Sequence, residues 1–438
     1  MFEVNWKFGQ KQNNMHRFDE AIPLCFAKHY FVARKDSSLV RSRQHHLSFC
    51  AIFVIVAIMW IHKLPAAVWF EQIKGSAMRK LLDYVVLAVV CCASANAADQ
   101  WGLERGTPDM KSAGSLTFGP EDVLFVGDTK SAAVFAIATG DTTGDPSKSN
   151  INVEDVVDKI GSLVGGNATI NDIAVSPATG NVFVSATAND KPALLKIDGA
   201  GKITQLSMTD VLFAKANLAG APEDKVTGEG RRAKNNRKDA ITDLAFFEGK
   251  LLISGLRNAS TASSVRELSF PFATADQGVG VQIYHAAHGK EEDYAAMRTF
   301  VPLMIDGEPN LLAAYVCTPL VKIPMKELES AADRIKGTTV AELGNRNQPL
   351  DMFSYTKDGG NYLLLSNSAR GVMKITTSGL SDNKGLTEPV RGGGAAGQSY
   401  DTVETMTGVI QMDKLNDTHA VLLVEKDGHQ NLRTVALP

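Results

Sequence analysis

Short apolar runs alternate with polar turns along most of the chain, and three long stretches repeat the same order. They begin at Ile170 ("INDIAVSPATGNVFVSATANDKPALLKIDGAG"), Ile241 ("ITDLAFFEGKLLISGLRNASTASSVRELSF") and Pro349 ("PLDMFSYTKDGGNYLLLSNSARGVMKITTSGL"). Each has an apolar run, a glycine-containing turn, a second apolar run, a polar loop and a third run. Short runs between such turns are typical of antiparallel hairpins. The pattern therefore predicts one small antiparallel sheet that is used repeatedly.

Three further segments follow the same order less regularly: Ser115–Asp141, Arg298–Leu328 and Thr405–Leu437. The chain then holds six units, spaced roughly 50–70 residues apart. A four-stranded sheet is too small to bury its own faces, whereas radial packing gives each sheet a neighbour on both sides. The predicted fold class is all-β, a six-bladed β-propeller of four-stranded antiparallel blades.

Closure of the ring requires one more strand, because the last unit shows three strands before the chain ends at Pro438. The segment "DQWGLERGTPDMKSAG" (residues 99–114) precedes the first unit. We expect this N-terminal strand to close the last blade and to protect its open edge.

Two segments depart from the repeat. Asn150–Gly165 has apolar residues at helical spacing, which predicts a short helix after the first blade. Leu212–Ala240 is polar, and we expect a long loop there between the second and third blades, a candidate lid over one face.

An aspartate opens the first strand of each of the three clearest units, at Asp172, Asp243 and Asp351, and Asn171 stands beside the first. The first strand of a propeller blade lines the central channel, so these side chains are predicted to converge at one mouth of it. Hard cations such as Ca²⁺ bind several carboxylate and amide oxygens. The four residues are therefore a predicted metal site with Ca²⁺ as the candidate cofactor. An aspartate before a strand also commonly accepts backbone N–H groups in a turn, and this structural alternative stays open.

The rhythm of the repeat, above all "INDIAVSPATGNVFVS" from Ile170, resembles the six-bladed propellers of the NHL, strictosidine-synthase and lactonase type over about residues 110–438. The resemblance implies the propeller fold. In the lactonases it also implies a channel metal held by acidic and amide residues at positions such as the four above. The other three units have Ser115, Phe300 and Thr407 at the equivalent positions. None of these residues matches the acidic residue that the family has in its first blade.

Two polar motifs are candidate ligand-binding sites. His285 and His288 are spaced as H-x-x-H, which can serve zinc or haem, although two ligands do not make a site. Asn345, Arg346 and Asn347 lead into an inner strand at the expected channel mouth, where they suit an anionic or sugar-like ligand. An asparagine-rich turn is the alternative for this second motif.

The N-terminal region differs from the repeats. Residues 78–97 have a basic start, a short apolar core and an A-x-A site ending at Ala97, which indicates a secretory signal peptide. Residues 1–77 are then a non-globular leader or a mis-called start, and residues 98–438 form the propeller domain. The alternative is an N-terminal anchor at Leu47–Ile61, which is shorter than the roughly 20 residues of a membrane-spanning helix. The mature chain is expected to be secreted or periplasmic, without membrane insertion.

The charge balance of the chain bears on which classes of partner it can bind. Residues 1–97 hold 12 Lys and Arg against 6 Asp and Glu, so the rest of the chain holds 33 against 42. An acidic body argues against nucleic acid and anionic lipid as partners. Cys317 is the only cysteine after residue 97, so the mature chain can form no internal disulfide. We expect its thiol to be buried on the second strand of its unit.

Three functions fit these features. The first is a secreted or periplasmic module that binds a protein or a small-molecule ligand. The second is a metal-assisted hydrolase or lactonase that uses Ca²⁺ at the axial aspartates. The third is a propeller partner of a redox enzyme, which predicts that His285 faces solvent. The fold alone does not choose among them, and the sequence names no substrate.

Overall fold

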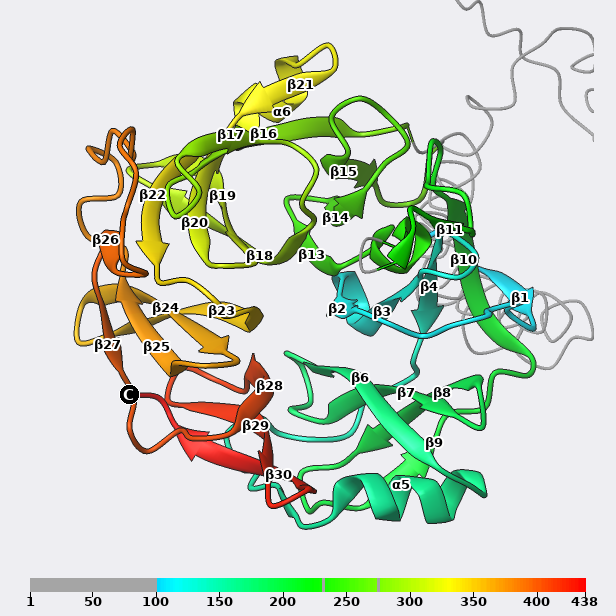
Figure 1. Cartoon of the computed structure of the whole chain (residues 1–438). Helices are drawn as coiled ribbons and strands as arrows, with labels where there is room; N and C mark the ends of the chain where they lie inside the picture. Colours follow the sequence, from blue (N-terminus) through cyan, green and yellow to red (C-terminus); the bar gives the residue numbers. More distant parts are fainter. Residues whose placement is uncertain (1–100, 231–232, 274–275) are drawn as a thin grey trace, which may run out of the picture. The chain divides into compact units, whose positions relative to one another are not determined.

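The structure, a computed structural model, describes residues 101–438 except 231–232 and 274–275. Figure 1 shows their small sheets arranged in a ring around a central axis, which confirms the predicted six-bladed β-propeller. The predicted signal peptide, the leader and the candidate anchor lie outside the described residues. Within the described residues, no helix combines the length and the apolar character needed to cross a membrane.

We number the blades by the order in which their inner strands occur in the chain. Blade 1 contains β2 (Leu116–Phe118), β3 (Val123–Asp128), β4 (Ala133–Ala138), β10 (Val211–Asn217) and β1 (Glu104–Gly106). Blade 2 contains β6 (Ala168–Val175), β7 (Val182–Ala188), β8 (Lys191–Ile197) and β9 (Ile203–Gln205). Blade 3 contains β13 (Asp243–Phe247), β14 (Lys250–Leu256), β15 (Ser263–Ser269), β16 (Val279–His285) and β17 (Lys290–Glu292), and β21 (Arg334–Lys336) pairs in parallel with β16.

The remaining blades are built in the same way. Blade 4 contains β18 (Met297–Ile305), β19 (Glu308–Tyr315), β20 (Pro319–Pro324), β22 (Thr338–Leu343) and β26 (Ala395–Gly397). Blade 5 contains β23 (Pro349–Lys357), β24 (Gly360–Asn367), β25 (Gly371–Thr376) and β27 (Tyr400–Thr402). Blade 6 contains β28 (Val409–Lys414), β29 (His419–Lys426), β30 (His429–Ala436) and β5 (Asn152–Val153).

Among the described residues, short elements lie both between and within the blades. They are two α-helices, α5 (Val156–Val164) and α6 (Met325–Ser330), two 3-10 turns, η3 (Pro120–Asp122) and η5 (Asn236–Asp239), and the hairpin of β11 (Val226–Thr227) and β12 (Lys234–Asn235). Helix α5 confirms the helix predicted after the first blade. Its buried Val156 and Ile160 pack into the core between blades 2 and 6.

The order of the blades around the ring differs from their order in the chain. Inner strand β2 lies between β6 and β13, and β6 lies next to β28, so blade 1 stands between blades 2 and 3. After β4 the chain runs to blade 6, forms β5 and α5, builds blade 2, and then returns to blade 1 as β10. Blade 1 is therefore assembled from two distant pieces of the chain.

This path corrects two predictions. The expected loop 212–240 begins with a strand, because β10 pairs with β4 as the outer part of blade 1. The ring is closed by an early segment, as predicted, but that segment is β5 and not residues 99–114, whose β1 pairs with β10. The physical reason is apolar burial, because Ile151 and Val153 fill the core between blades 2 and 6 beside Leu432. Glu104 and Arg105 of β1 are exposed instead.

Candidate functional site

The predicted aspartates occupy equivalent places on three inner strands. Asp172, Asp243 and Asp351 lie on β6, β13 and β23, and each pairs with a serine of the second strand of its blade: Ser185, Ser254 and Ser366. An inner strand has a neighbour in its own sheet on one side only. On its other side, toward the axis, backbone N–H groups need partners from elsewhere.

The carboxylates supply those partners. In each aspartate Oδ1 accepts the N–H of the next residue, and Oδ2 accepts an N–H from the inner strand of an adjacent blade. The second contacts run from Leu116 to Asp172 (2.7 Å), from Phe300 to Asp243 (2.9 Å) and from Met412 to Asp351 (2.7 Å). The aspartates therefore join blade 2 to blade 1, blade 3 to blade 4, and blade 5 to blade 6.

A fourth aspartate, missed in the sequence, does the same. Asp413 on β28 accepts the N–H groups of Lys414 and Val175, both at 2.7 Å, and joins blade 6 to blade 2. Gln411 occupies the position of blade 6 that corresponds to Asp351. Asp413 stands two residues later, and the period of two along a strand places it on the same face. This two-residue alternation along the strand could have identified Asp413 from the sequence.

The axial carboxyl groups are held in a partly desolvated cluster. Burial raises the pKa of Asp243 and of Asp413 to about 6. Burial and the charge of Asp351 raise the pKa of Asp172 well above its usual value, and burial with the nearby Asp243 and Asp413 does the same for Asp351. With its amide nitrogen directed toward the axis, Gln411 donates to Asp172 Oδ1 (2.9 Å) and to Asp351 Oδ2 (3.0 Å).

These contacts match the structural alternative for the axial residues. Every axial carboxylate already accepts two backbone N–H groups, and the Asn171 amide donates to Ala113 O and Thr187 Oγ1. The Ca²⁺ site at Asn171, Asp172, Asp243 and Asp351 stays a prediction. A metal there would share the carboxylate oxygens with the hydrogen bonds that join the blades.

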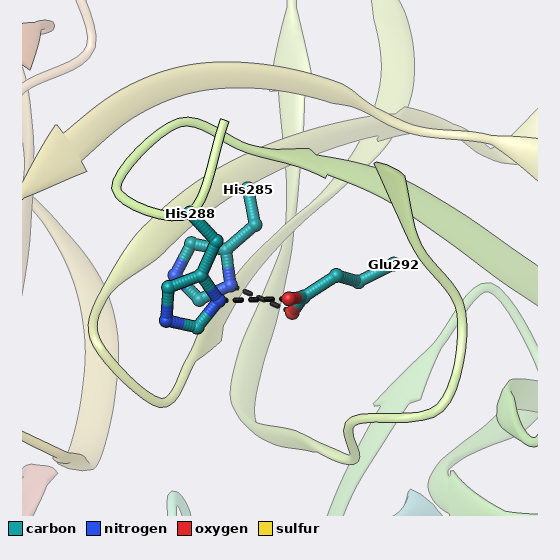
Figure 2. Close-up of side chains that lie close together, drawn as sticks. All are labelled: His285, His288 and Glu292. Atoms are coloured by element: carbon teal, nitrogen blue, oxygen red, sulfur yellow. Dashed lines mark hydrogen bonds and ion pairs between the residues drawn. The ribbon is translucent and has the colours of Figure 1, made fainter. Parts of the chain in front are cut away.

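A second cluster lies in the outer hairpin of blade 3. His285 is the last residue of β16, and it pairs with Lys290 of β17. Glu292 pairs with Ile283, two residues before His285, so His285 and Glu292 share one face of the hairpin. His288 in the connecting turn folds back over the same face. Figure 2 shows both imidazole rings directed at the Glu292 carboxylate.

The geometry of this cluster is tight. His285 Nδ1 lies 2.8 Å from Glu292 Oε2, and His288 Nδ1 lies 2.7 Å from Glu292 Oε1. The two rings are 3.8 Å apart between centroids. One ligand atom from each of the three residues lies within 4.8 Å of the others, and among the described residues this is the one group of three or more such side chains that meets this distance.

Burial and hydrogen bonding set the charges. His285 and Glu292 are only 3% and 4% exposed, whereas the His288 side chain is 43% exposed. Burial lowers the pKa of His285, which favours the neutral ring. Although burial opposes ionisation of Glu292, hydrogen bonds from His285, His288 and Tyr294 lower its pKa to about 2. The result is an ionised carboxylate beside a neutral buried imidazole.

One further carboxyl group borders the cluster. Glu342 on β22 of blade 4 is buried and accepts the N–H of Ala287, which lies between the two histidines. Burial raises the pKa of Glu342 to about 7. Its Oε1 atom and the Nε2 atom of His285 are both buried and have no hydrogen-bond partner among the described residues. Glu292 and Glu342 were both missed in the sequence, and the hairpin alternation could have found Glu292.

The asparagine-rich motif forms a turn. Asn347 is buried, donates to Gly344 O (3.0 Å) and accepts from Asn367 Nδ2 (3.1 Å) and from Thr318 Oγ1. Asn345 is half-buried and Arg346 is exposed, so a ligand role for Asn345, Arg346 and Asn347 stays a prediction. The hydrogen bonds of the Asn347 side chain link the loops of blades 4 and 5.

The prediction that Cys317 is buried on the second strand of its unit is wrong. Strand β19 ends at Tyr315, so Cys317 lies in the following turn with a φ of 67° and not on the strand. Cys317 is partly exposed and not buried as expected, because the apolar strand ends before it.

No protein-family model and no curated protein sequence matches the chain. Among solved structures it is similar to the PQQ-bound form of aldose sugar dehydrogenase from Streptomyces coelicolor, with 12% identity, 76% of this chain and 97% of that chain covered, and a TM-score of 0.25. It is also similar to the dihydro-heme d1 dehydrogenase NirN in complex with DHE, with 10% identity, 74% and 56% covered, and a TM-score of 0.30. These similarities concern the fold alone, and they do not distinguish the NHL, strictosidine-synthase or lactonase type. The chain is a six-bladed β-propeller, and that resemblance within the fold stays a prediction.

Proposed function

We propose that this protein is an exported, ligand-binding β-propeller and that its ligand is a divalent transition metal ion of the zinc class. The observation that carries the proposal is the convergence of His285, His288 and Glu292 in the outer hairpin of blade 3, with ligand atoms within 4.8 Å of one another. The site sharpens the expectation of a ligand-binding module.

The donor set selects the kind of metal. Two imidazole nitrogens and one carboxylate oxygen suit Zn²⁺ and similar ions, whereas Ca²⁺ requires six to eight oxygen ligands. Zinc sites with three protein ligands keep a fourth position for water or another ligand. The exposure of His288 supplies an entry path, and the buried His285 and Glu292 supply a fixed base for the site.

Two other hypotheses have less support. Calcium-assisted hydrolysis requires axial oxygens that converge on one ion, whereas among the described residues the ligand atoms that gather within 4.8 Å are those of His285, His288 and Glu292. The redox-partner hypothesis expected His285 to face solvent, but His285 is buried.

Export rests on the signal-like segment of residues 78–97. The proposal predicts a mature chain that begins at Ala98. Sequencing of the N-terminus of protein recovered from the secreted or periplasmic fraction tests it, and protein found only inside the cell with residues 78–97 attached contradicts it.

The metal proposal is tested by calorimetric titration of the purified, chelator-treated protein with Zn²⁺ and with Ca²⁺. We expect one Zn²⁺ per chain and no Ca²⁺ binding at this site. His288→Ala removes one ligand from a partly exposed turn, so the fold is retained and Zn²⁺ affinity falls by at least about tenfold.

His429→Ala is the matched control, because His429 is a surface histidine that also bonds a carboxylate, Asp155. The control should bind Zn²⁺ as the wild type does. A wild-type protein without Zn²⁺ affinity, or an unchanged affinity in His288→Ala, overturns the proposal.

A further inference from the structure

We infer that the metal site takes a small oxyanion as its fourth ligand, held by Lys290 and Tyr294. This inference rests on the proposed metal site. It concerns the class of ligand that completes the site: a carboxylate or phosphate group.

Four hydrogen-bond donors surround the single carboxylate of Glu292. His285 Nδ1 occupies Oε2, while His288 Nδ1 (2.7 Å), Tyr294 Oη (2.9 Å) and Lys290 Nζ (3.4 Å) share Oε1. Lys290 Nζ also lies 5.6 Å from the centre of the Tyr294 ring. A cation and a hydroxyl group therefore stand together on the same side of the carboxylate as His288.

Metal binding would reduce the number of acceptor positions on Glu292 that are available to these donors. An ionised carboxylate accepts through about four lone-pair positions. Once Glu292 coordinates a metal, Oε1 has less capacity for the Tyr294 hydroxyl and the Lys290 ammonium. Both residues lie at the surface, with the Lys290 side chain 57% exposed and Tyr294 50% exposed. They are then the donors nearest to the open side of the site.

The charge balance favours an anion there. A divalent metal with Lys290 outweighs Glu292 and Glu342, even when both carboxyl groups are ionised. Of the two flanking acids, Glu291 is neutralised by Lys336 at 2.6 Å, and the Asp293 carboxylate accepts a hydrogen bond from Thr261 at 3.3 Å. A negatively charged oxygen ligand would satisfy the metal, the ammonium group and the hydroxyl group together.

Co²⁺ loading provides the test, because the visible spectrum of bound Co²⁺ reports its inner ligands. The Co²⁺ protein is titrated with acetate, with inorganic phosphate and with perchlorate at equal ionic strength. We expect saturable spectral changes with acetate or phosphate and none with perchlorate. The two productive anions separate a carboxylate ligand from a phosphate ligand.

Variants locate the anion. In Lys290→Gln and in Tyr294→Phe we expect the dissociation constant of the anion to rise about tenfold, with Co²⁺ affinity within about threefold of the wild type. Lys426→Gln, which changes an exposed lysine on β29 of blade 6, should change neither value. Co²⁺ binding without an anion-dependent spectrum, or with anion affinity unchanged in both variants, overturns this inference and leaves the metal site standing. Absence of Co²⁺ and Zn²⁺ binding in the wild type overturns both.

Discussion

The axis and the outer hairpin of blade 3 both hold desolvated carboxyl groups, and they use them in opposite ways. At the axis, Asp172, Asp243, Asp351 and Asp413 accept backbone N–H groups from two strands each. In the hairpin, Glu292 accepts from side chains, two of which are imidazoles. A backbone N–H keeps its hydrogen, so the axial bonds are permanent parts of the fold. An imidazole can exchange its bond to the carboxylate for a bond to a metal.

The pKa shifts follow the same division. Burial raises the pKa values of the axial aspartates, whereas side-chain donors hold that of Glu292 at about 2. The axis therefore gathers carboxyl groups that resist ionisation, and the hairpin keeps one that is ionised in all ordinary buffers. Below about pH 6 the charge of the axial groups is therefore incomplete, whereas the charge of Glu292 at the rim is present.

Removal of an axial carboxylate should give the largest effect. In Asp351→Ala the N–H groups of Met352 and Met412 lose their acceptor in a region closed by blades 5 and 6. With a cost of about 1–3 kcal/mol for each unsatisfied buried group, we expect the free energy of unfolding to fall by about 3 kcal/mol. Urea denaturation measures it.

Asp351→Asn keeps one acceptor oxygen and should lose less than the alanine variant. Asp382→Ala, an exposed aspartate, should change stability by less than about 0.5 kcal/mol. If Asp351→Ala is as stable as the wild type, the axial aspartates do not hold the blades together.

The pH dependence of stability separates the axial aspartates from Glu292 by sign. Asp243 and Asp413 titrate at about 6 in the fold against an ordinary value of 3.8, so their contribution is complete below 3.8 and is lost as the pH rises through about 6. Glu342, raised to about 7, acts in the same direction. Glu292 contributes above its ordinary 4.5, and that contribution is lost only as the pH falls through about 2.

Stability should therefore decrease between pH 5 and pH 8 through the axial groups and Glu342, whereas Glu292 is already ionised throughout that range. Asp413→Asn cannot ionise and should reduce the decrease by about 1 kcal/mol. Glu292→Gln removes a nearby charge that helps to raise the pKa of Glu342, so it should reduce the decrease, by less than Asp413→Asn does. Urea unfolding at both pH values measures the difference, and a stability that rises with pH over this range contradicts the assignment.

The blades could be predicted from the sequence because each is a local unit. Strands such as β6 and β7 are joined by a short turn, and the apolar pattern of residues 170–188 records both. The ring order could not be predicted, because it depends on pairings between distant segments. Strand β5 is two residues long and has no periodic signal, and β10 pairs with β4 about 75 residues earlier in the chain.

Only part of the candidate site could be predicted from the sequence. His285 and His288 stand out as a motif, but the third ligand depends on the register of the hairpin, in which Glu292 pairs with Ile283. The axial aspartates were found by their recurrence in the repeat. Their hydrogen bonds to neighbouring blades could not be predicted, since those contacts depend on which blades are adjacent.

The smallest expected effect is that of calcium. Each axial carboxylate accepts two N–H groups that join strands, and the axial aspartates are not among the described residues whose ligand atoms gather within 4.8 Å, so we expect no Ca²⁺ site at Asn171, Asp172, Asp243 and Asp351. Addition of millimolar Ca²⁺, or of a Ca²⁺ chelator, should therefore shift the melting temperature by less than about 1 °C. Zn²⁺ at 100 times its dissociation constant should stabilise the fold by about 2.7 kcal/mol. A calcium-dependent rise that disappears in Asp351→Asn would restore the axial metal site and reverse the roles assigned to the two regions.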